Sequence, residues 1–355
     1  MMDAMSTHAR TSADPVTSLP VVDLSQWDPA VPDSERSVAF LDGLRDATHR
    51  IGFFYLVGHG IPDDRIAELM DVSRRFFALP EADKLAIENL RSPHFRGYTR
   101  VGGERTQGRT DWREQIDIGP ERPAVPAGPG VPDFEVLEGP NQWPAALPEL
   151  QQVMERWDAT LADLGRTLLA AWAVSLGQPA DVFDAAFADR PSTLIKIVRY
   201  PARPEPEAKQ GVGAHKDGGV LTLLLVEPGK GGLQVEHDGG WIDAPPVPGA
   251  FVVNIGELLE VATGGYLKAT VHRVESPPVG SDRISVPYFF NPALAARIPL
   301  LTLPPELAAE AAGVTADPDN PIFDTYGANA LKSRLRAHPD VAAIHHADLV
   351  AAQAH

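Results

Sequence analysis

Apolar residues recur along this chain with two different periods. In the first half the spacing is helical, and it predicts amphipathic helices over residues 34–50 and 148–176 and a further helix that starts at Pro62. Short apolar runs at residues 19–24 and 53–57, the second flanked by glycines, predict strands instead. The stripe over residues 148–176 is the longest, so we expect this helix to be buried against a sheet.

From residue 193 the pattern changes to short runs of Val, Ile, Leu and Thr between Gly and Pro turns. The Asp-Gly pair within residues 237–240 predicts a tight hairpin turn. Many short strands at this spacing are typical of a double-sheet jelly roll, so we expect a mainly β fold with flanking helices. The expected strands are residues 194–200, 220–226, 233–236, 241–244, 251–255, 268–274 and 283–290.

We expect the 355 residues to form a single integrated domain with consecutive parts. The N-terminus is polar and lacks the apolar core of a secretory signal, which predicts a disordered tail. The expected parts are the tail (1–17), an N-terminal α/β region (18–120), loop and support helices (121–190), the jelly-roll core (191–295), and a C-terminal helical segment and tail (296–355).

Composition narrows the possible partners. The chain has 48 acidic against 31 basic residues and a formal net charge of −17, so neither nucleic acid nor an anionic membrane surface is an expected partner. A small-molecule substrate is expected instead, and the oligomeric state is left open. The chain has no cysteine, so any metal site must use His, Asp or Glu, and a cytoplasmic location is expected.

Three residues form a plausible metal triad. His215 and Asp217 are two positions apart at the expected start of a strand, where side chains at i and i+2 share one face. His272 follows within another expected strand. Two imidazoles and one carboxylate suit Fe(II), Mn(II) or Zn(II), and as a facial triad they are typical of non-haem Fe(II) oxygenases. Each histidine taken alone would more often be an ordinary strand residue; the others are expected in tails, turns or helix surfaces, with His345 and His346 in a solvated tail.

A second pair, Arg283 and Ser285, repeats the i, i+2 arrangement. A guanidinium is always charged and binds a carboxylate through a fork of N–H donors, and the hydroxyl adds a further donor. An arginine buried in a barrel requires an anion to pair with it. A dicarboxylate that also chelates the metal would meet both needs, and Tyr200 is a further candidate donor. A surface arginine, or one paired with an aspartate, is the competing interpretation.

At this point the chain resembles the isopenicillin N synthase-like 2-oxoglutarate/Fe(II) dioxygenases. The resemblance covers about residues 18–340. It depends on the motif around His215 and Asp217 (residues 213–225), on Thr-Val-His-Arg-Val around His272, and on the segments at residues 19–24, 52–60, 76–80, 231–235, 241–243, 248–256 and 283–292. It departs from the family at Thr263-Gly-Gly265, where Thr-Asn-Gly is frequent, and at Val198-Arg-Tyr-Pro201, where many plant members carry Asn-Tyr-Tyr-Pro.

The resemblance implies a double-stranded β-helix (jelly-roll) core and an enzyme that uses Fe(II), 2-oxoglutarate and O2. It implies His215, Asp217 and His272 as iron ligands, with Arg283 and Ser285 on the distal carboxylate of 2-oxoglutarate. Tyr200 falls where some members place another hydrogen bond to that carboxylate. The expected 2-oxoglutarate-binding residues are therefore Arg283, Ser285 and Tyr200. The two departures lie near the pocket, so substrate identity does not transfer with the family.

Candidate substrate contacts lie near the expected mouth of the barrel, and ordinary packing competes with this role at every one. If Lys196 or Arg113 faces the pocket, a substrate with a carboxylate is favoured, such as an amino acid, a peptide or an acidic secondary metabolite. The candidates are Lys196, Arg96, Tyr98, Trp112, Arg113, Phe290 and Asn291.

Three functions fit the sequence. The leading one is a 2-oxoglutarate-dependent oxygenase that hydroxylates an unactivated C–H bond of a small metabolite and releases succinate and CO2. An Fe(II) oxidase or cyclase, or an ethylene-forming enzyme of the same family, is the second. A non-catalytic jelly-roll binding module is the third, and the intact triad argues against it. Whether the outcome is hydroxylation, desaturation or cyclisation is left open.

Overall fold

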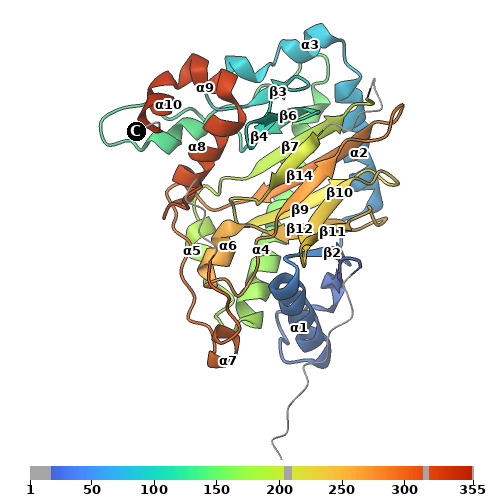
Figure 1. Ribbon diagram of the computed structural model, residues 1–355, viewed down its shortest axis with the longest axis vertical. Coiled ribbons are helices and arrows are strands. Elements are labelled where there is room, and N and C mark those ends of the chain that lie inside the picture. The colour runs from blue at the N-terminus through green and yellow to red at the C-terminus, as the bar shows by residue number, and fades with distance from the viewer. Residues whose placement is uncertain (1–16, 204–209, 315–319, 354–355) are drawn as a thin grey trace, which may run out of the picture.

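Two facing β-sheets form the centre of the molecule (Figure 1). The computed structural model describes residues 17–203, 210–314 and 320–353. The large sheet runs in the order β1 (Val21–Asp23), β2 (Phe53–Val57), β12 (Phe251–Ile255), β9 (Leu221–Val226), β14 (Arg283–Phe290), β7 (Leu194–Tyr200), β6 (Glu114–Ile118) and β3 (Gly97–Thr99). The small sheet runs in the order β11 (Gly240–Asp243), β10 (Leu233–His237), β13 (His272–Glu275) and β8 (Gln210–His215). Apart from parallel β1 and β2, neighbouring strands of these sheets pair antiparallel, and the expected jelly-roll core with flanking helices is confirmed.

Helices cover the outer face of the large sheet. The longest is α4 (Glu149–Ser175), and it packs beside α1 (Glu35–Arg50) and α2 (Asp63–Phe77). The whole predicted stripe of α4 is buried, which confirms it as the support helix. Ser34 caps α1, since its Oγ accepts from the backbone N–H of Ser37 at 3.3 Å. The short helices are η1 (Leu24–Gln26), α3 (Glu81–Leu85), η2 (Asn89–Arg91), η3 (Asp133–Leu137), α5 (Asp184–Phe187), α6 (Glu257–Ala262) and α7 (Pro305–Ala308).

Strand β14 shows how the sheet separates two environments. Its even-numbered residues, from Ile284 to Phe290, belong to the apolar core on the helix side. The opposite parity turns Arg283 and Ser285 toward the small sheet. A second apolar core fills the space between the sheets, with Val198 and Val252 from the large sheet and Val235 from the small one. The site residues therefore face an enclosed interior between two sheets.

Most predicted strands are present, but one begins later than expected and further strands were not predicted. The strands at 53–57, 194–200, 251–255 and 283–290 have the expected bounds. The expected strand at 268–274 is wrong in its first part, because β13 begins only at His272. Strands β3, β6 and β8 were not expected. The hairpin turn is confirmed: His237 pairs with Gly240, and Asp238 and Gly239 have φ of 49° and 75°.

The C-terminal helices lie over the β3–β6 end of the large sheet (Figure 1). They are α8 (Tyr326–Ala337), α9 (Pro339–His345) and α10 (Ala347–Gln353). The expectation of a solvated His345–His346 tail is wrong, because His345 Nε2 lies 2.9 Å from Leu90 O and His346 Nε2 lies 2.7 Å from Pro93 O. None of the described helices has the length and apolar character to cross a membrane. The predicted tail lies, except for its last residue, outside the described residues.

Candidate active site

The three predicted metal ligands meet at the edge of the small sheet. His215 ends β8 and His272 begins β13, and the two residues are direct cross-strand partners. Asp217 lies in the turn after β8. One ligand atom from each of the three lies within 4.8 Å of the other two. The sequence placed His215 and Asp217 at the start of a strand, which is wrong: antiparallel pairing and the turn bring the triad together.

Hydrogen bonds fix which imidazole nitrogens face the metal position. Nδ1 of His215 lies 2.8 Å from Gly213 O, and Nδ1 of His272 lies 3.1 Å from Thr270 O. A carbonyl only accepts, so each Nδ1 carries the proton and each Nε2 keeps its lone pair. Both Nε2 atoms point toward Asp217 Oδ1, at 3.7 and 3.8 Å. Burial, followed by the neighbouring His272, lowers the pKa of His215 to about 4, so its imidazole is neutral at neutral pH.

Asp217 presents one oxygen to the metal and is held by the other. Its Oδ2 accepts from Thr222 Oγ1 at 2.6 Å and from Asn254 Nδ2 at 2.8 Å. Burial raises the pKa of this carboxyl, but His272, His215 and the two hydrogen bonds outweigh it, and the pKa is lower than usual. Two neutral imidazoles and one ionised carboxylate fit a divalent iron ion. Neither Thr222 nor Asn254 was predicted, although each is a polar residue within an apolar strand.

Thr222→Val is expected to weaken metal binding about 10-fold. The substitution keeps the shape of the side chain and removes the 2.6 Å hydrogen bond to Asp217, while Asn254 still holds the carboxylate. Titration of the metal-free protein with Mn(II), followed by electron paramagnetic resonance, measures the change. Thr167→Val, on the exposed side of α4, is the matched control; an equal effect in both variants would contradict the assignment.

The predicted clamp lies on the interior face of β14. Arg283 is 1% exposed, and its Nη1 donates to Ser285 Oγ at 3.2 Å. Its guanidinium carbon lies 4.8 Å from the ring centre of Tyr200, its cross-strand partner. Burial lowers the pKa of Arg283, and within the described residues no ion pair joins it to a carboxylate. A buried cation without an anion is costly, so this position fits the carboxylate of a bound ligand.

Two of the predicted substrate contacts lie on the wrong side of the sheet. The Tyr98 hydroxyl donates to Glu114 Oε2 at 2.6 Å, and its ring centre lies 6.1 Å from that of Phe76. The Phe290 ring stacks on Phe187 at 4.7 Å. Both belong to the core beneath the helices, because strand parity turns them away from the barrel interior. Their assignment to a substrate pocket is corrected accordingly.

Three other candidates hold the backbone in place. Arg96 Nη2 donates to a backbone oxygen at 3.0 Å, and Trp112 Nε1 donates to another at 3.2 Å. Asn291 Oδ1 accepts from the N–H of Val220 at 3.0 Å. These bonds give each residue a structural role, and their roles toward a substrate stay predictions.

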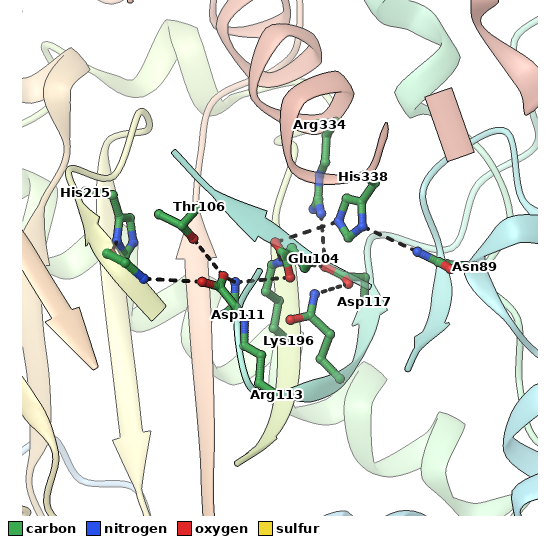
Figure 2. Close-up of polar contacts among 12 residues, drawn as sticks. Asn89, Glu104, Thr106, Asp111, Arg113, Asp117, Lys196, His215, Arg334 and His338 are labelled. Carbon is green, nitrogen blue, oxygen red and sulfur yellow. Dashed lines mark hydrogen bonds and ion pairs between the residues drawn. The ribbon is translucent and has the colours of Figure 1, made fainter. Parts of the chain in front are cut away.

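The last two candidates belong to a buried acid–base network that extends from the metal strand toward α8 (Figure 2). Lys196 Nζ lies 2.8 Å from Glu104 Oε1 and 3.2 Å from Asp117 Oδ1. Arg113 Nη2 lies 3.1 Å from Glu104 Oε2 and 3.2 Å from Asp111 Oδ2. Each cation thus already has two carboxylate partners. Their charges are therefore already matched, so neither needs a substrate carboxylate to neutralise it.

The network joins the metal strand to the C-terminal helices. At one end Asp111 Oδ1 accepts from the N–H of Gly213 at 3.3 Å, two residues before His215. At the other end Arg334 Nη1 of α8 lies 3.0 Å from Asp117 Oδ1. Burial raises the pKa of Asp117, but Lys196 and Arg334 bring it to about 2. His338, between α8 and α9, is 1% exposed, and burial lowers its pKa to about 4.

A jelly roll with two imidazoles, one carboxylate and a buried arginine defines a non-haem iron oxygenase that takes a carboxylate cosubstrate. Two protein-family models that match the chain agree with this class of enzyme. A model for the N-terminal region of the non-haem dioxygenase in morphine synthesis matches residues 19–146, and the 2OG-Fe(II) oxygenase superfamily model matches residues 192–292.

Individual proteins match over most of the chain. The 2-oxoglutarate-dependent dioxygenase frbJ of Dothideomycetidae sp. is 35% identical over 91% of this chain and 90% of its own length. The homoarginine-6-hydroxylase 2-ODD-C23.1 of Arabidopsis thaliana is 35% identical over 77% of this chain and 84% of its own. Full-length Neurospora crassa T7H, solved with alpha-KG and 5-formyluracil, is 26% identical, with a TM-score of 0.70 over 92% of this chain and 99% of that one.

The chain belongs to the 2OG-Fe(II) oxygenase superfamily. It is a 2-oxoglutarate-dependent dioxygenase, and Fe(II) and 2-oxoglutarate are its cofactor and cosubstrate. The triad fits the metal by ligand type and geometry. The non-catalytic binding module is therefore excluded.

Proposed function

We propose that the enzyme hydroxylates an unactivated C–H bond of a small metabolite. One atom of O2 enters the alcohol and the other enters succinate, while 2-oxoglutarate loses CO2. The observation that carries the proposal is the buried Arg283 on the same barrel interior as the triad, which no ion pair joins to a carboxylate within the described residues. In this proposal Arg283 and Ser285 hold the distal carboxylate of 2-oxoglutarate, and Tyr200 lies beside them. A cytoplasmic location stays a prediction.

The chain's own residues have three tasks in this reaction. His215, Asp217 and His272 hold the iron, which when bound supplies the site of O2 reduction. Thr222 and Asn254 keep Asp217 oriented through the oxygen that does not face the metal. The apolar core between the sheets limits water around the site.

The decisive experiment measures oxidation and cosubstrate consumption together. Protein supplied with Fe(II), ascorbate, 2-oxoglutarate and O2 is incubated with candidate metabolites, including homoarginine, the substrate in the name of several relatives. Succinate is followed by nuclear magnetic resonance and the product by mass spectrometry. One succinate per product with a gain of one oxygen atom supports hydroxylation. Absence of succinate with any substrate, or without one, would overturn the proposal.

The same experiment separates the oxidase, cyclase and ethylene-forming alternatives. An oxidase forms product without succinate, and an ethylene-forming enzyme releases ethylene from 2-oxoglutarate. Desaturation and cyclisation consume 2-oxoglutarate but remove two hydrogen atoms from the substrate instead of adding oxygen. The product mass therefore assigns the outcome once a substrate is found.

A further inference from the structure

Unpartnered polar atoms gather at one place in the interior. In the described residues, eight buried side-chain polar atoms lack a hydrogen-bond partner, and five of them belong to the acid–base network or to its direct neighbours. Buried polar groups are nearly always satisfied, so a cluster of exceptions indicates a missing ligand or ordered water. The five are Thr99 Oγ1, Glu104 Oε2, Arg113 Nε, Gln115 Oε1 and His338 Nε2.

These atoms are neighbours through the fold. Thr99 and Gln115 are cross-strand partners on β3 and β6. Gln115 Nε2 donates to Asp117 Oδ2 at 2.6 Å, which leaves its Oε1 free. Glu104 Oε2 lies 3.1 Å from Arg113 but without the geometry of a hydrogen bond. His338 Nε2 lies 3.8 Å from Glu104 Oε1, too far for a direct bond.

A cavity adjoins this cluster. It has a volume of about 370 Å³, and both Thr99 and His338 line it. Figure 2 shows the network lying between His215 at one end and His338 at the other. The cavity is large enough for a metabolite of amino-acid size. Thr99 and His338 thus border the cavity, and Asp111 at the other end of the network accepts from the N–H of Gly213 in the metal strand.

The charges of the network cancel. Its carboxylates are Glu104, Asp111 and Asp117, and its cations are Arg113, Lys196 and Arg334. A ligand with a net charge would leave one member of this buried set without a partner, which is costly. A ligand with no net charge that still carries donors and acceptors preserves the balance.

The five unpartnered atoms include both hydrogen-bond donors and hydrogen-bond acceptors. Glu104 Oε2 and Gln115 Oε1 only accept hydrogen bonds, whereas Arg113 Nε only donates. His338 Nδ1 lies 3.4 Å from the Asn89 amide nitrogen, which donates, so its Nε2 carries the proton. Thr99 does either. A complementary ligand therefore offers N–H donors to the acceptors Glu104 and Gln115 and an anionic acceptor to the donors Arg113 and His338.

We infer that this network is the substrate-recognition site of the enzyme, and that it selects a small zwitterion of the amino-acid class. The inference rests on the proposed function, because it assigns the substrate of that reaction. Glu104 and Gln115 receive the cationic nitrogen group, and Arg113 and His338 receive the carboxylate. A purely anionic substrate would leave the acceptors unmet, and an apolar substrate would leave all five atoms unmet.

The test compares charge types at constant carbon skeleton. The probes are the proteinogenic L-amino acids and L-homoarginine, each beside its N-acetyl and methyl-ester derivatives. They are added to the full-length protein with Fe(II) and 2-oxoglutarate, and succinate release is measured. At least one free amino acid should stimulate release, and either derivative should lose 10-fold or more in kcat/KM. If no free amino acid stimulates release, or if blocked derivatives work as well, the inference is overturned.

Variants separate recognition from structural support. Thr99→Val removes only an unpartnered hydroxyl, so we expect no loss in Tm without substrate and a 3- to 10-fold rise in substrate KM. Glu104→Gln should raise the KM further. Glu114→Gln is the matched control, because Glu114 is equally buried but points to the opposite face of β6, toward Lys84. If the network only supports α8, Thr99→Val and Glu114→Gln will leave substrate KM equally unchanged, and the inference fails.

A separate measurement keeps this inference distinct from the proposed function. Succinate release without substrate, and the visible absorption of the Fe(II)–2-oxoglutarate complex under nitrogen, report on the metal and cosubstrate sites alone. If both signals are observed while no zwitterion stimulates succinate release, the enzyme is an oxygenase but its substrate is not a zwitterion. If both are absent, the proposed function itself falls.

Discussion

Alanine in place of His215 is expected to abolish substrate oxidation and to lower iron affinity by more than about 100-fold. Loss of a residue that only orients a ligand typically costs 10- to 100-fold, so loss of a ligand should exceed this range. His215 supplies one of three ligand atoms, and no other described histidine, aspartate or glutamate completes a comparable cluster. Iron content after anaerobic loading and succinate formation with substrate measure the two effects.

His237→Ala is the matched control, because His237 ends β10 of the same small sheet and its side chain lies 3.4 Å from the carboxylate of the adjacent Asp238, away from the triad. It should bind iron and turn over as the unmodified protein does. Retention of full turnover by His215→Ala would show that the metal assignment is wrong. Added imidazole is expected to restore part of the turnover of the variant, and such rescue would identify the missing ligand as the cause.

The triad could be predicted from the sequence, although residue spacing alone does not determine how its three members meet. Spacing put His215 and Asp217 on one face of a strand, whereas Asp217 lies in a turn and is oriented by Thr222 and Asn254. The partnership with His272 depends on the β8–β13 register, which joins residues far apart in the sequence. Only the family resemblance supplied that pairing in advance.

The clamp was better determined, because it depends on strand parity alone. The rule that placed Ser285 beside Arg283 also excludes Phe290, which lies an odd number of positions from Arg283 on the same strand. That error could have been avoided from the sequence. Applied consistently, the alternation would have assigned Phe290 to the helix side.

The buried acid–base network could not have been found from the sequence pattern alone. From Gln115 onward strand β6 alternates polar and apolar residues, a pattern that predicts a polar face toward solvent. Here Gln115 and Asp117 instead face the interior, where ion pairs with distant residues such as Arg334 neutralise the buried charge. The burial of His338 is not evident from its neighbours in the sequence, because Glu104, Asp117 and Lys196 reach it from distant parts of the chain.

Arg283→Leu is expected to separate cosubstrate binding from stability. Arg283 offers a carboxylate hydrogen bonds from a charged donor, each worth about 1.5–3 kcal/mol, and two such bonds correspond to about a 100-fold or larger rise in the Kd for 2-oxoglutarate. The protein without 2-oxoglutarate should nevertheless be as stable as before or more so. The reason is that the substitution replaces a buried cation, for which the described part of the chain offers no carboxylate partner, with an apolar group.

Arg113→Leu is expected to have the opposite effect: it should lower stability and leave 2-oxoglutarate binding intact. Its removal leaves Glu104 with Lys196 alone and takes from Asp111 its cationic partner among the described residues. Breaking a buried pair in this way costs about 3–5 kcal/mol. Thermal unfolding with and without 2-oxoglutarate distinguishes the two variants. Arg283→Leu should keep its Tm and lose the upward shift caused by 2-oxoglutarate, whereas Arg113→Leu should lose Tm and keep a shift. A large drop in Tm for Arg283→Leu with its 2-oxoglutarate shift intact would mean that Arg283 supports the fold and does not bind the cosubstrate.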